Sequence, residues 1–196
     1  MNLPNKLSLL RIFLVPVFVV TFYLSWEYSR YIATGIFVVA TLTDFLDGYI
    51  ARKHNLVTDL GKLLDPIADK LLVTSALFCV VSVASTPTYA IVLAVCSAVI
   101  VARELLVSAI RQIGASKGQV ISANVFGKIK TILQDVALPA IIILQCPAFI
   151  SVFDGSLVYD LLFYLAAALF ALATLMTIIS GTIYLVQNKK IFGGTN

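Results

Sequence analysis

Three stretches without any charged residue constrain what this chain can fold into. Positions 71–102, 136–153 and 161–188 contain no Asp, Glu, Lys or Arg. Each is long enough to cross the hydrocarbon core of a bilayer, which takes roughly 17–25 helical residues. Only 12% of the chain is charged and 60% is hydrophobic, whereas soluble domains carry roughly a quarter charged residues. The polar–apolar alternation of outer-membrane strands does not occur. The sequence therefore predicts an all-α, polytopic membrane protein.

Turn residues divide the chain into six predicted transmembrane helices within a single membrane domain covering residues 1–196. A short amphipathic surface helix is expected in "NLPNKLSLLR", ahead of the first span. "CPAFISVFDGS" is expected to be the last turn. The six spans are predicted near 9–24, from 31 into the acidic segment described below, and near 59–83, 88–113, 128–144 and 157–186.

The positive charges orient these spans. Of the fourteen Lys and Arg residues, only Arg30 falls in the three connections on the side opposite the N-terminus. Cytoplasmic ends of spans carry the excess of Lys and Arg, so both termini are predicted to be cytoplasmic in a plasma-membrane protein. The net charge of +4 suits contact with anionic membrane lipids. Binding of nucleic acid is not expected, because the cations stand at span ends rather than on one soluble face.

Four aspartates form the most unusual cluster for a membrane protein. Asp44, Asp47, Asp65 and Asp69 lie in "TDFLDGYIARKHNLVTDLGKLLDPIADK". At about 100° per helical residue, the first two lie about 60° apart and the last two about 40° apart, so each pair shares a helix face. An antiparallel hairpin of the second and third spans would bring all four together at the cytoplasmic side. Unpaired burial would cost several kcal/mol for each carboxylate.

Two explanations account for these carboxylates, and the more specific one is a divalent metal site. Ligands that are all oxygen favour Mg²⁺ or Mn²⁺ over zinc, and two carboxylate pairs suit two ions that clamp a phosphoryl group. Gly48 and Gly61 would let a ligand approach the backbone closely, although tight helix packing explains either glycine equally well. The alternative is a solvated loop in which Arg52, Lys62 and Lys70 form ion pairs with the aspartates.

The order and spacing of these residues resemble a known signature. Asp44-x2-Asp47-Gly48-x2-Ala51-Arg52-x8-Gly61-x3-Asp65-x3-Asp69 is similar, without a departure, to that of the CDP-alcohol phosphotransferase family. The resemblance implies an enzyme in which the four aspartates hold two divalent ions, Mg²⁺ or Mn²⁺, and in which Asp69 also acts as general base. It also implies a homodimer. The CDP contacts implied by the resemblance are Asn5, Asp44, Asp47, Gly48, Arg52 and Gly61.

The sequence segments flanking the motif indicate which acceptor the reaction uses. "NLPNKLSLLRI", "ARELLVSAIR" and "GKIKTILQD" resemble the branch of this family whose acceptor is sn-glycerol 3-phosphate. The resemblance implies that CDP-diacylglycerol and this acceptor give phosphatidylglycerol phosphate and CMP, in phospholipid biosynthesis. The motif itself leaves other acceptors open, namely inositol phosphate, serine or phosphatidylglycerol, because it handles the shared CDP half.

An acceptor carrying a phosphate needs cations of its own. Arg103 and Arg111 lie eight residues apart in the fourth predicted span, and Lys128 and Lys130 open the fifth. Arg suits bidentate phosphate capture and Lys supplies a mobile point charge. These four residues are predicted to bind the glycerol phosphate, although ordinary anchoring at the cytoplasmic surface explains each lysine equally well.

A cation transporter is a more distant alternative for a membrane protein with four acidic residues. Transport sites tend to lie near the bilayer midplane on broken helices. Here the acids adjoin Arg52 and Lys53 at the predicted cytoplasmic edge, which favours a substrate arriving from water on one side.

Overall fold

The computed structural model describes residues 3–54, 59–116, 118 and 124–189, without the side chains at 3–4, 45–54, 59–66 and 69. The described residues form α-helices and no strand. The helices are α1 (Leu3–Tyr23), α2 (Ser29–His54), α3 (Asp59–Ser82), α4 (Pro87–Ser116), α5 (Val125–Leu144), α6 (Pro147–Phe153) and α7 (Leu157–Gln187).

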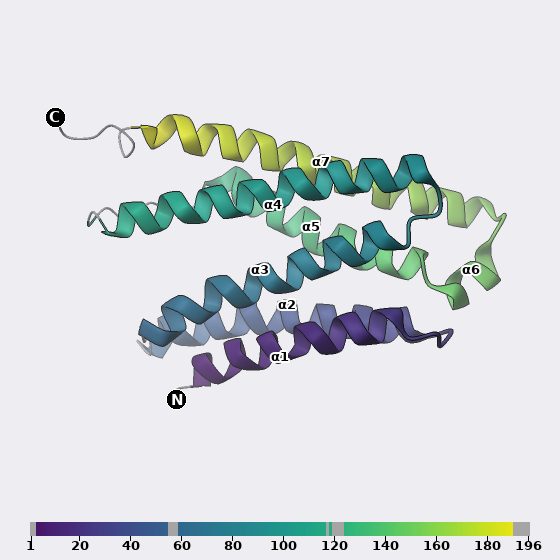
Figure 1. Cartoon of the computed structure of the whole chain (residues 1–196), viewed down its shortest axis with the longest axis horizontal. Coiled ribbons are helices and arrows are strands. Elements are labelled where there is room, and N and C mark those ends of the chain that lie inside the picture. The colour runs from purple at the N-terminus through teal and green to yellow at the C-terminus, as the bar shows by residue number, and fades with distance from the viewer. Residues whose placement is uncertain (1–2, 55–58, 117, 119–123, 190–196) are drawn as a thin grey trace.

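The long helices run side by side as two groups (Figure 1). In the first group α1 packs on α2 and α3, and in the second α7 packs on α4 and α5. The groups meet where α3 contacts α4 and α5, and where α2 contacts α5. The start of α1, the end of α2 and the end of α7 lie at one end of the bundle, and α6 lies at the other (Figure 1).

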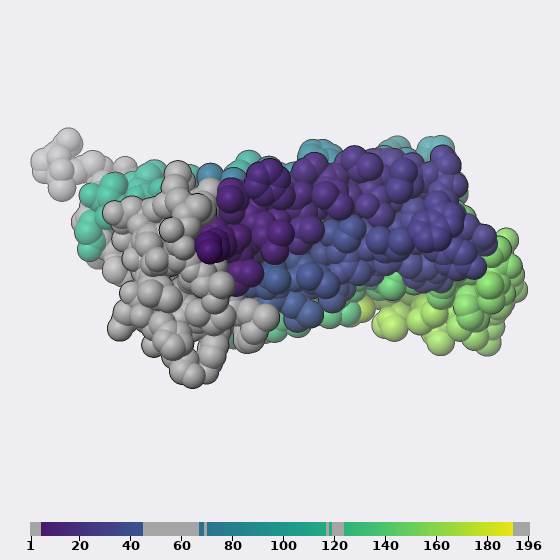
Figure 2. Space-filling model, turned by 90° about the horizontal axis from the view of Figure 1, so that it is seen from below, coloured from purple at the N-terminus to yellow at the C-terminus, as the bar shows by residue number. Residues whose placement is uncertain are grey.

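Helix α1 shows how the sequence sorts its two faces. Its buried positions recur at helical spacing, and so do its exposed positions on the opposite face. The buried set is Arg11, Val15, Phe18 and Phe22, and the exposed set is Leu10, Phe13, Val17 and Val20. Figure 2 shows the surface of α1 running along one side of the molecule. Beyond Lys6 the exposed face is apolar, while the charged Arg11 is buried, which is the arrangement expected when lipid surrounds the bundle.

In the second helix group, α7 likewise has polar side chains facing inward. The inward face of α7 carries the buried residues Thr174, Thr177, Ser180 and Tyr184. Thr174, Thr177 and Ser180 donate hydrogen bonds to carbonyl oxygens of their own helix, so their hydroxyls are satisfied within α7. Hydroxyl groups inside the bundle, together with large apolar residues on its surface, support a membrane protein.

Three helices of the described part are long and apolar enough to span a bilayer, namely α1, α4 and α7. The bent pair α5–α6 makes a fourth if it counts as one span. Helices α2 and α3 do not meet this test over their described residues, although residues 70–82 of α3 form a shorter apolar segment. The prediction of a helical membrane protein is confirmed, whereas the count of six spans stays a prediction. The separate surface helix also stays a prediction, since α1 is continuous from Leu3 to Tyr23.

The predicted last turn is partly wrong. Within "CPAFISVFDGS", residues Pro147–Phe153 form the helix α6, which stands at 71° to α5. Pro147 occupies the start of the helix, where its missing N–H costs nothing and its fixed φ is already helical. Gly155, with φ of 72°, then takes a left-handed conformation that glycine adopts readily, and the chain turns into α7.

Candidate functional site

Asp44 is the one signature aspartate whose side chain the structure describes. It lies on α2, where its Oδ1 accepts a hydrogen bond from Nη1 of Arg11 on α1 at 2.6 Å. The Arg11 side chain is fully buried, while 44% of the Asp44 side chain is exposed. A buried guanidinium therefore fixes one carboxylate oxygen and leaves much of the group accessible to a ligand.

The other predictions for the acidic motif lie outside the described side chains. They concern Asp47, Gly48, Arg52, Gly61, Asp65 and Asp69. Asn5 is described and is 4% exposed on α1. Among the described side chains there is no group of three His, Cys, Asp or Glu residues that could hold a metal. The metal site therefore stays a prediction.

Two of the four predicted acceptor-binding cations meet at one carboxylate. Oε1 of Glu104 accepts hydrogen bonds from Nη1 of Arg103 at 3.0 Å and from Nζ of Lys130 at 2.7 Å. The exposed fractions of the three side chains are 13% for Arg103, 24% for Glu104 and 3% for Lys130. Two cations thus share one anion in a largely buried place, and this cluster keeps a net positive charge.

Two glycines leave room for the Arg103 side chain between α5 and α7. A Cβ at Gly181 would lie 3.0 Å from Cγ of Arg103, and a Cβ at Gly127 would lie 3.2 Å from its Nη2. Both distances are shorter than ordinary carbon contacts of about 3.5–4.0 Å. Nε of Arg103 is buried and has no hydrogen-bond partner in the described part of the chain. The side chain is therefore confined, and one of its donors still lacks an acceptor.

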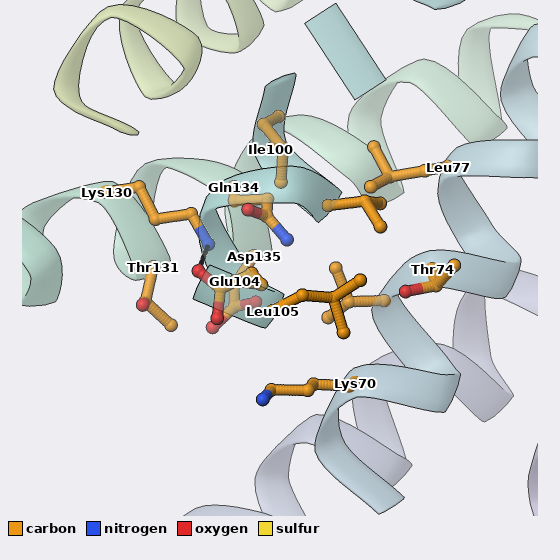
Figure 3. Close-up of a pocket in the computed structure, with 12 residues that line it drawn as sticks. Lys70, Thr74, Leu77, Ile100, Glu104, Leu105, Lys130, Thr131, Gln134 and Asp135 are labelled. Atoms are coloured by element: carbon orange, nitrogen blue, oxygen red, sulfur yellow. Dashed lines mark hydrogen bonds and ion pairs between the residues drawn. The ribbon is translucent and has the colours of Figure 1, made fainter. Parts of the chain in front are cut away.

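A cavity between α3, α4 and α5 adjoins this cluster. Glu104 and Lys130 meet at one edge of it, and Lys70 reaches toward it from α3 (Figure 3). Lys70 also hydrogen-bonds Oγ of Ser108 on α4, which ties the two helix groups together. Gln134 lies beside Lys130 in the lining (Figure 3) and is 2% exposed, and its amide oxygen has no hydrogen-bond partner among the described residues. The polar lining of the cavity thus consists mainly of two cations, Lys70 and Lys130, two carboxylates, Glu104 and Asp135, and the amide of Gln134.

The remaining two predicted cations lie apart from Glu104. Nε of Arg111 donates to the Tyr184 hydroxyl at 3.0 Å, and its guanidinium carbon lies 5.6 Å from the centre of that ring. Arg111 itself is exposed, and so is Lys128 on α5. The structure therefore brings Arg103 and Lys130 together and leaves Arg111 and Lys128 at the surface.

Three residues of this region were not among the predicted site residues. In the sequence Glu104 is marked only by its position next to Arg103, and Gln134 gives no signal because amides are common in helices. Arg11 did carry a signal, since a lone cation inside the apolar segment "LSLLRIFLV" is a functional candidate by default in a membrane span.

Comparison with known proteins decides the family. The model of the family described as CDP-alcohol phosphatidyltransferase matches residues 1–179. This chain belongs to that family. The resemblance read from the aspartate motif is therefore confirmed.

Curated relatives in this family cover nearly the whole chain. The chain is 36% identical to a Bacillus subtilis (strain 168) protein named CDP-diacylglycerol–glycerol-3-phosphate 3-phosphatidyltransferase, over 100% of this chain and 99% of that protein. It is 39% identical to a Rickettsia bellii (strain RML369-C) protein of the same name, over 97% of each. A Haemophilus influenzae relative of that name is 40% identical over 70% of this chain.

Proposed function

We propose that this chain transfers the phosphatidyl group of CDP-diacylglycerol to sn-glycerol 3-phosphate, giving phosphatidylglycerol phosphate and CMP. The observation that carries this proposal is the near-complete coverage at 36–39% identity by relatives that bear the name of this transferase. The acidic motif of α2 and α3 supports the CDP half of the reaction, and the cations beside the cavity support a phosphorylated acceptor.

The chemistry is a displacement at phosphorus. The primary hydroxyl of sn-glycerol 3-phosphate attacks the β-phosphorus of CDP-diacylglycerol, and a new P–O bond forms. The bond from that phosphorus to the oxygen bridging toward CMP breaks, and CMP leaves with the electron pair. Asp69 accepts the proton of the attacking hydroxyl as general base. Asn5, Gly48, Arg52 and Gly61 contact the CDP half, in line with the family motif.

The carboxylates of the motif fit a divalent metal. Oxygen donors are those that Mg²⁺ and Mn²⁺ prefer, and Asp44 keeps much of its carboxylate exposed beside Arg11. We propose two ions held by Asp44, Asp47, Asp65 and Asp69. Ions bound there would offset the negative charge on the pyrophosphate and on departing CMP. The role of Arg11 is to hold the Asp44 carboxylate in one orientation, as residues behind a metal ligand do.

The acceptor phosphate is proposed to bind at Arg103 and Lys130, with Arg111 and Lys128 attracting it from the surface. The net positive charge around Glu104 favours a dianion. The unpartnered Nε of Arg103 gives a charge-assisted donor for a phosphate oxygen. A phosphate bound there would also lower the cost of keeping two cations in a largely buried place.

The positions of the positive charges support a proposed topology. We propose six spans, formed by α1 to α5 and α7, in a single domain of residues 1–196 in the plasma membrane. The surface helix, if separate, is the start of α1. Both termini and the aspartates face the cytoplasm, where the water-soluble acceptor and CMP are found. A homodimer is proposed from the family resemblance alone.

Acceptor assays with the purified chain test this proposal. Given CDP-diacylglycerol and Mg²⁺ or Mn²⁺, CMP should be released with sn-glycerol 3-phosphate and not with inositol phosphate, serine or phosphatidylglycerol. If CMP release requires inositol phosphate, serine or phosphatidylglycerol instead, that compound is the acceptor. Uptake of divalent metal into liposomes without any lipid product would instead favour a transporter.

The variant Asp69→Asn tests the mechanism within the same assay. It removes the proton acceptor with little change in shape, and turnover should fall by at least about a hundredfold with the melting temperature retained. Chelation by EDTA should likewise stop CMP release. Normal turnover in the variant would refute the role of Asp69.

A further inference from the structure

A second cavity lies at the end of the bundle remote from Asp44. It forms where α2 begins, α3 leads into α4, and α5 bends into α6 (Figure 1). Its volume is about 260 Å³. It has no lining residue in common with the cavity beside Glu104. The polar lining residues are Arg30, Ser85, Tyr89, Gln145 and Tyr159.

Arg30 supplies a cation to this cavity. It is half-buried, and its Nη1 donates to the backbone carbonyl of Gln145, while its guanidinium carbon lies 5.3 Å from the centre of the Phe22 ring. A guanidinium has five N–H donors, so most remain for other acceptors. Within the described part of the chain, no Asp or Glu forms an ion pair with Arg30. Because a partly buried cation without a paired carboxylate is unfavourable, an anion is the complement that Arg30 lacks.

Gln145 adds an acceptor to the same lining. It is 8% exposed, and its Nε2 donates to the carbonyl of Val80 at 3.3 Å. Its Oε1 is buried and accepts no hydrogen bond from the residues that the structure describes. The lining thus combines a strong donor with an unused acceptor, which suits a phosphate that carries an ammonium or hydroxyl group nearby.

The exposed aromatic residues indicate at which level of the bilayer this cavity lies. Trp26, Tyr28 and Tyr31 precede or follow Arg30 closely and are 55%, 50% and 36% exposed. Tyr164, near the start of α7 at the same end, is 70% exposed. Trp and Tyr gather at the level of lipid head groups. Arg30 therefore stands where the phosphates of the leaflet remote from Asp44 are found.

We propose that this second cavity binds a phosphate group at the Arg30 guanidinium, carried by a phospholipid head group or present as free phosphate. The ligand would contact α2 through Arg30, α4 through Tyr89 and α7 through Tyr159, and so bridge the two helix groups. The proposal is independent of the transfer reaction, because none of these residues belongs to the site described above.

Native mass spectrometry of the full chain in detergent tests the proposal. Dioleoylphosphatidylethanolamine is titrated in, since it is neither substrate nor product of the proposed reaction. Arg30→Gln should bind one lipid at least about tenfold more weakly than the unaltered chain, as expected for loss of charge-assisted hydrogen bonds. Lys189→Gln is the matched control, since it removes the same charge just beyond the end of α7 at Gln187, which lies at the other end of the bundle (Figure 1), and it should bind normally. Equal binding of both the lipid and inorganic phosphate by the unaltered chain and Arg30→Gln would overturn the proposal, as would an equal loss in the control.

A second arm identifies the source of the phosphate. Millimolar inorganic phosphate is added to both proteins, and phosphate binding that Arg30→Gln loses while the two proteins bind the lipid equally assigns the cavity to free phosphate. Lipid binding that Arg30→Gln loses, and that persists in the unaltered chain under these conditions, assigns it to a head group.

A second variant covers the case in which Arg30→Gln does not fold. Ser85 is exposed between α3 and α4 and lines the cavity, so Ser85→Phe narrows the cavity while Arg30 stays intact. Its lipid binding should also fall by about tenfold, with the melting temperature unchanged. Normal lipid binding by folded Ser85→Phe would contradict the proposal.

Discussion

Replacing Glu104 by Gln should destabilise the protein by an amount that the structure allows to be estimated. The carboxylate is the shared acceptor of Arg103 and Lys130, at 3.0 and 2.7 Å. Removing one partner of a buried ion pair costs about 3–5 kcal/mol. Since 24% of the Glu104 side chain is exposed, water screens part of the remaining charge, and we expect about 2–3 kcal/mol. For a chain of this size, that lowers the melting temperature by roughly 4–12 °C.

The same variant distinguishes a phosphate site from a purely structural ion cluster. With the carboxylate neutral, Arg103 and Lys130 lack an anion, and a bound phosphate dianion would replace it. Adding sn-glycerol 3-phosphate should therefore raise the melting temperature of Glu104→Gln more than that of the unaltered chain. Differential scanning fluorimetry in detergent measures both shifts. Glu27→Gln is the control, because Glu27 is exposed in the connection between α1 and α2, which lies at the other end of the bundle (Figure 1). Two results would refute this reasoning. One is that sn-glycerol 3-phosphate raises the melting temperatures of Glu104→Gln and the unaltered chain equally. The other is that Glu104→Gln without this ligand melts at the same temperature as the unaltered chain.

Two further changes probe how the site is held. Gly181→Ala places a Cβ 3.0 Å from Cγ of Arg103, so the KM for sn-glycerol 3-phosphate should rise about tenfold with a smaller change in kcat. Gly35→Ala, where an added Cβ meets nothing within 4 Å, is its matched control, and an equal rise there would contradict the explanation. Arg11→Lys keeps the charge but alters the hydrogen bond to Asp44, so affinity for Mn²⁺ should fall by about 10- to 100-fold. Electron paramagnetic resonance of the ion without substrates measures this, and unaltered affinity would show that Arg11 does not orient the carboxylate.

The sequence predicted most of the fold because hydrophobicity and turn residues are local signals. The third predicted span, at 59–83, agrees with α3 (Asp59–Ser82), and the last, at 157–186, agrees with α7 (Leu157–Gln187). Helix α6 was missed because Pro147 beside Cys146 reads equally well as a turn or as the first residue of a helix. The start of the fifth span was placed at 128, although α5 already begins at Val125. Asn124 caps α5 by accepting from the N–H of Phe126.

The candidate site was harder to predict, because it depends on how separate helices align. Arg103 and Lys130 were each singled out as cations, but their meeting at Glu104 requires a particular register of α4 against α5. No local pattern gives that register. Neither the 3.0 Å approach to Gly181 nor the ion pair between Arg11 and Asp44 is visible in the order of residues, since both join segments more than thirty positions apart.

The division of the bundle into two helix groups has a practical consequence for redesign. The aspartate motif stands on α2 and α3, whereas Arg103 and Lys130 stand on α4 and α5. On the roles proposed above for these residues, a chimera that keeps residues 1–82 and takes its later helices from a relative with another acceptor should exchange the alcohol while retaining the nucleotide-activated donor. The contact of Lys70 with Ser108 marks the junction that such a graft must preserve.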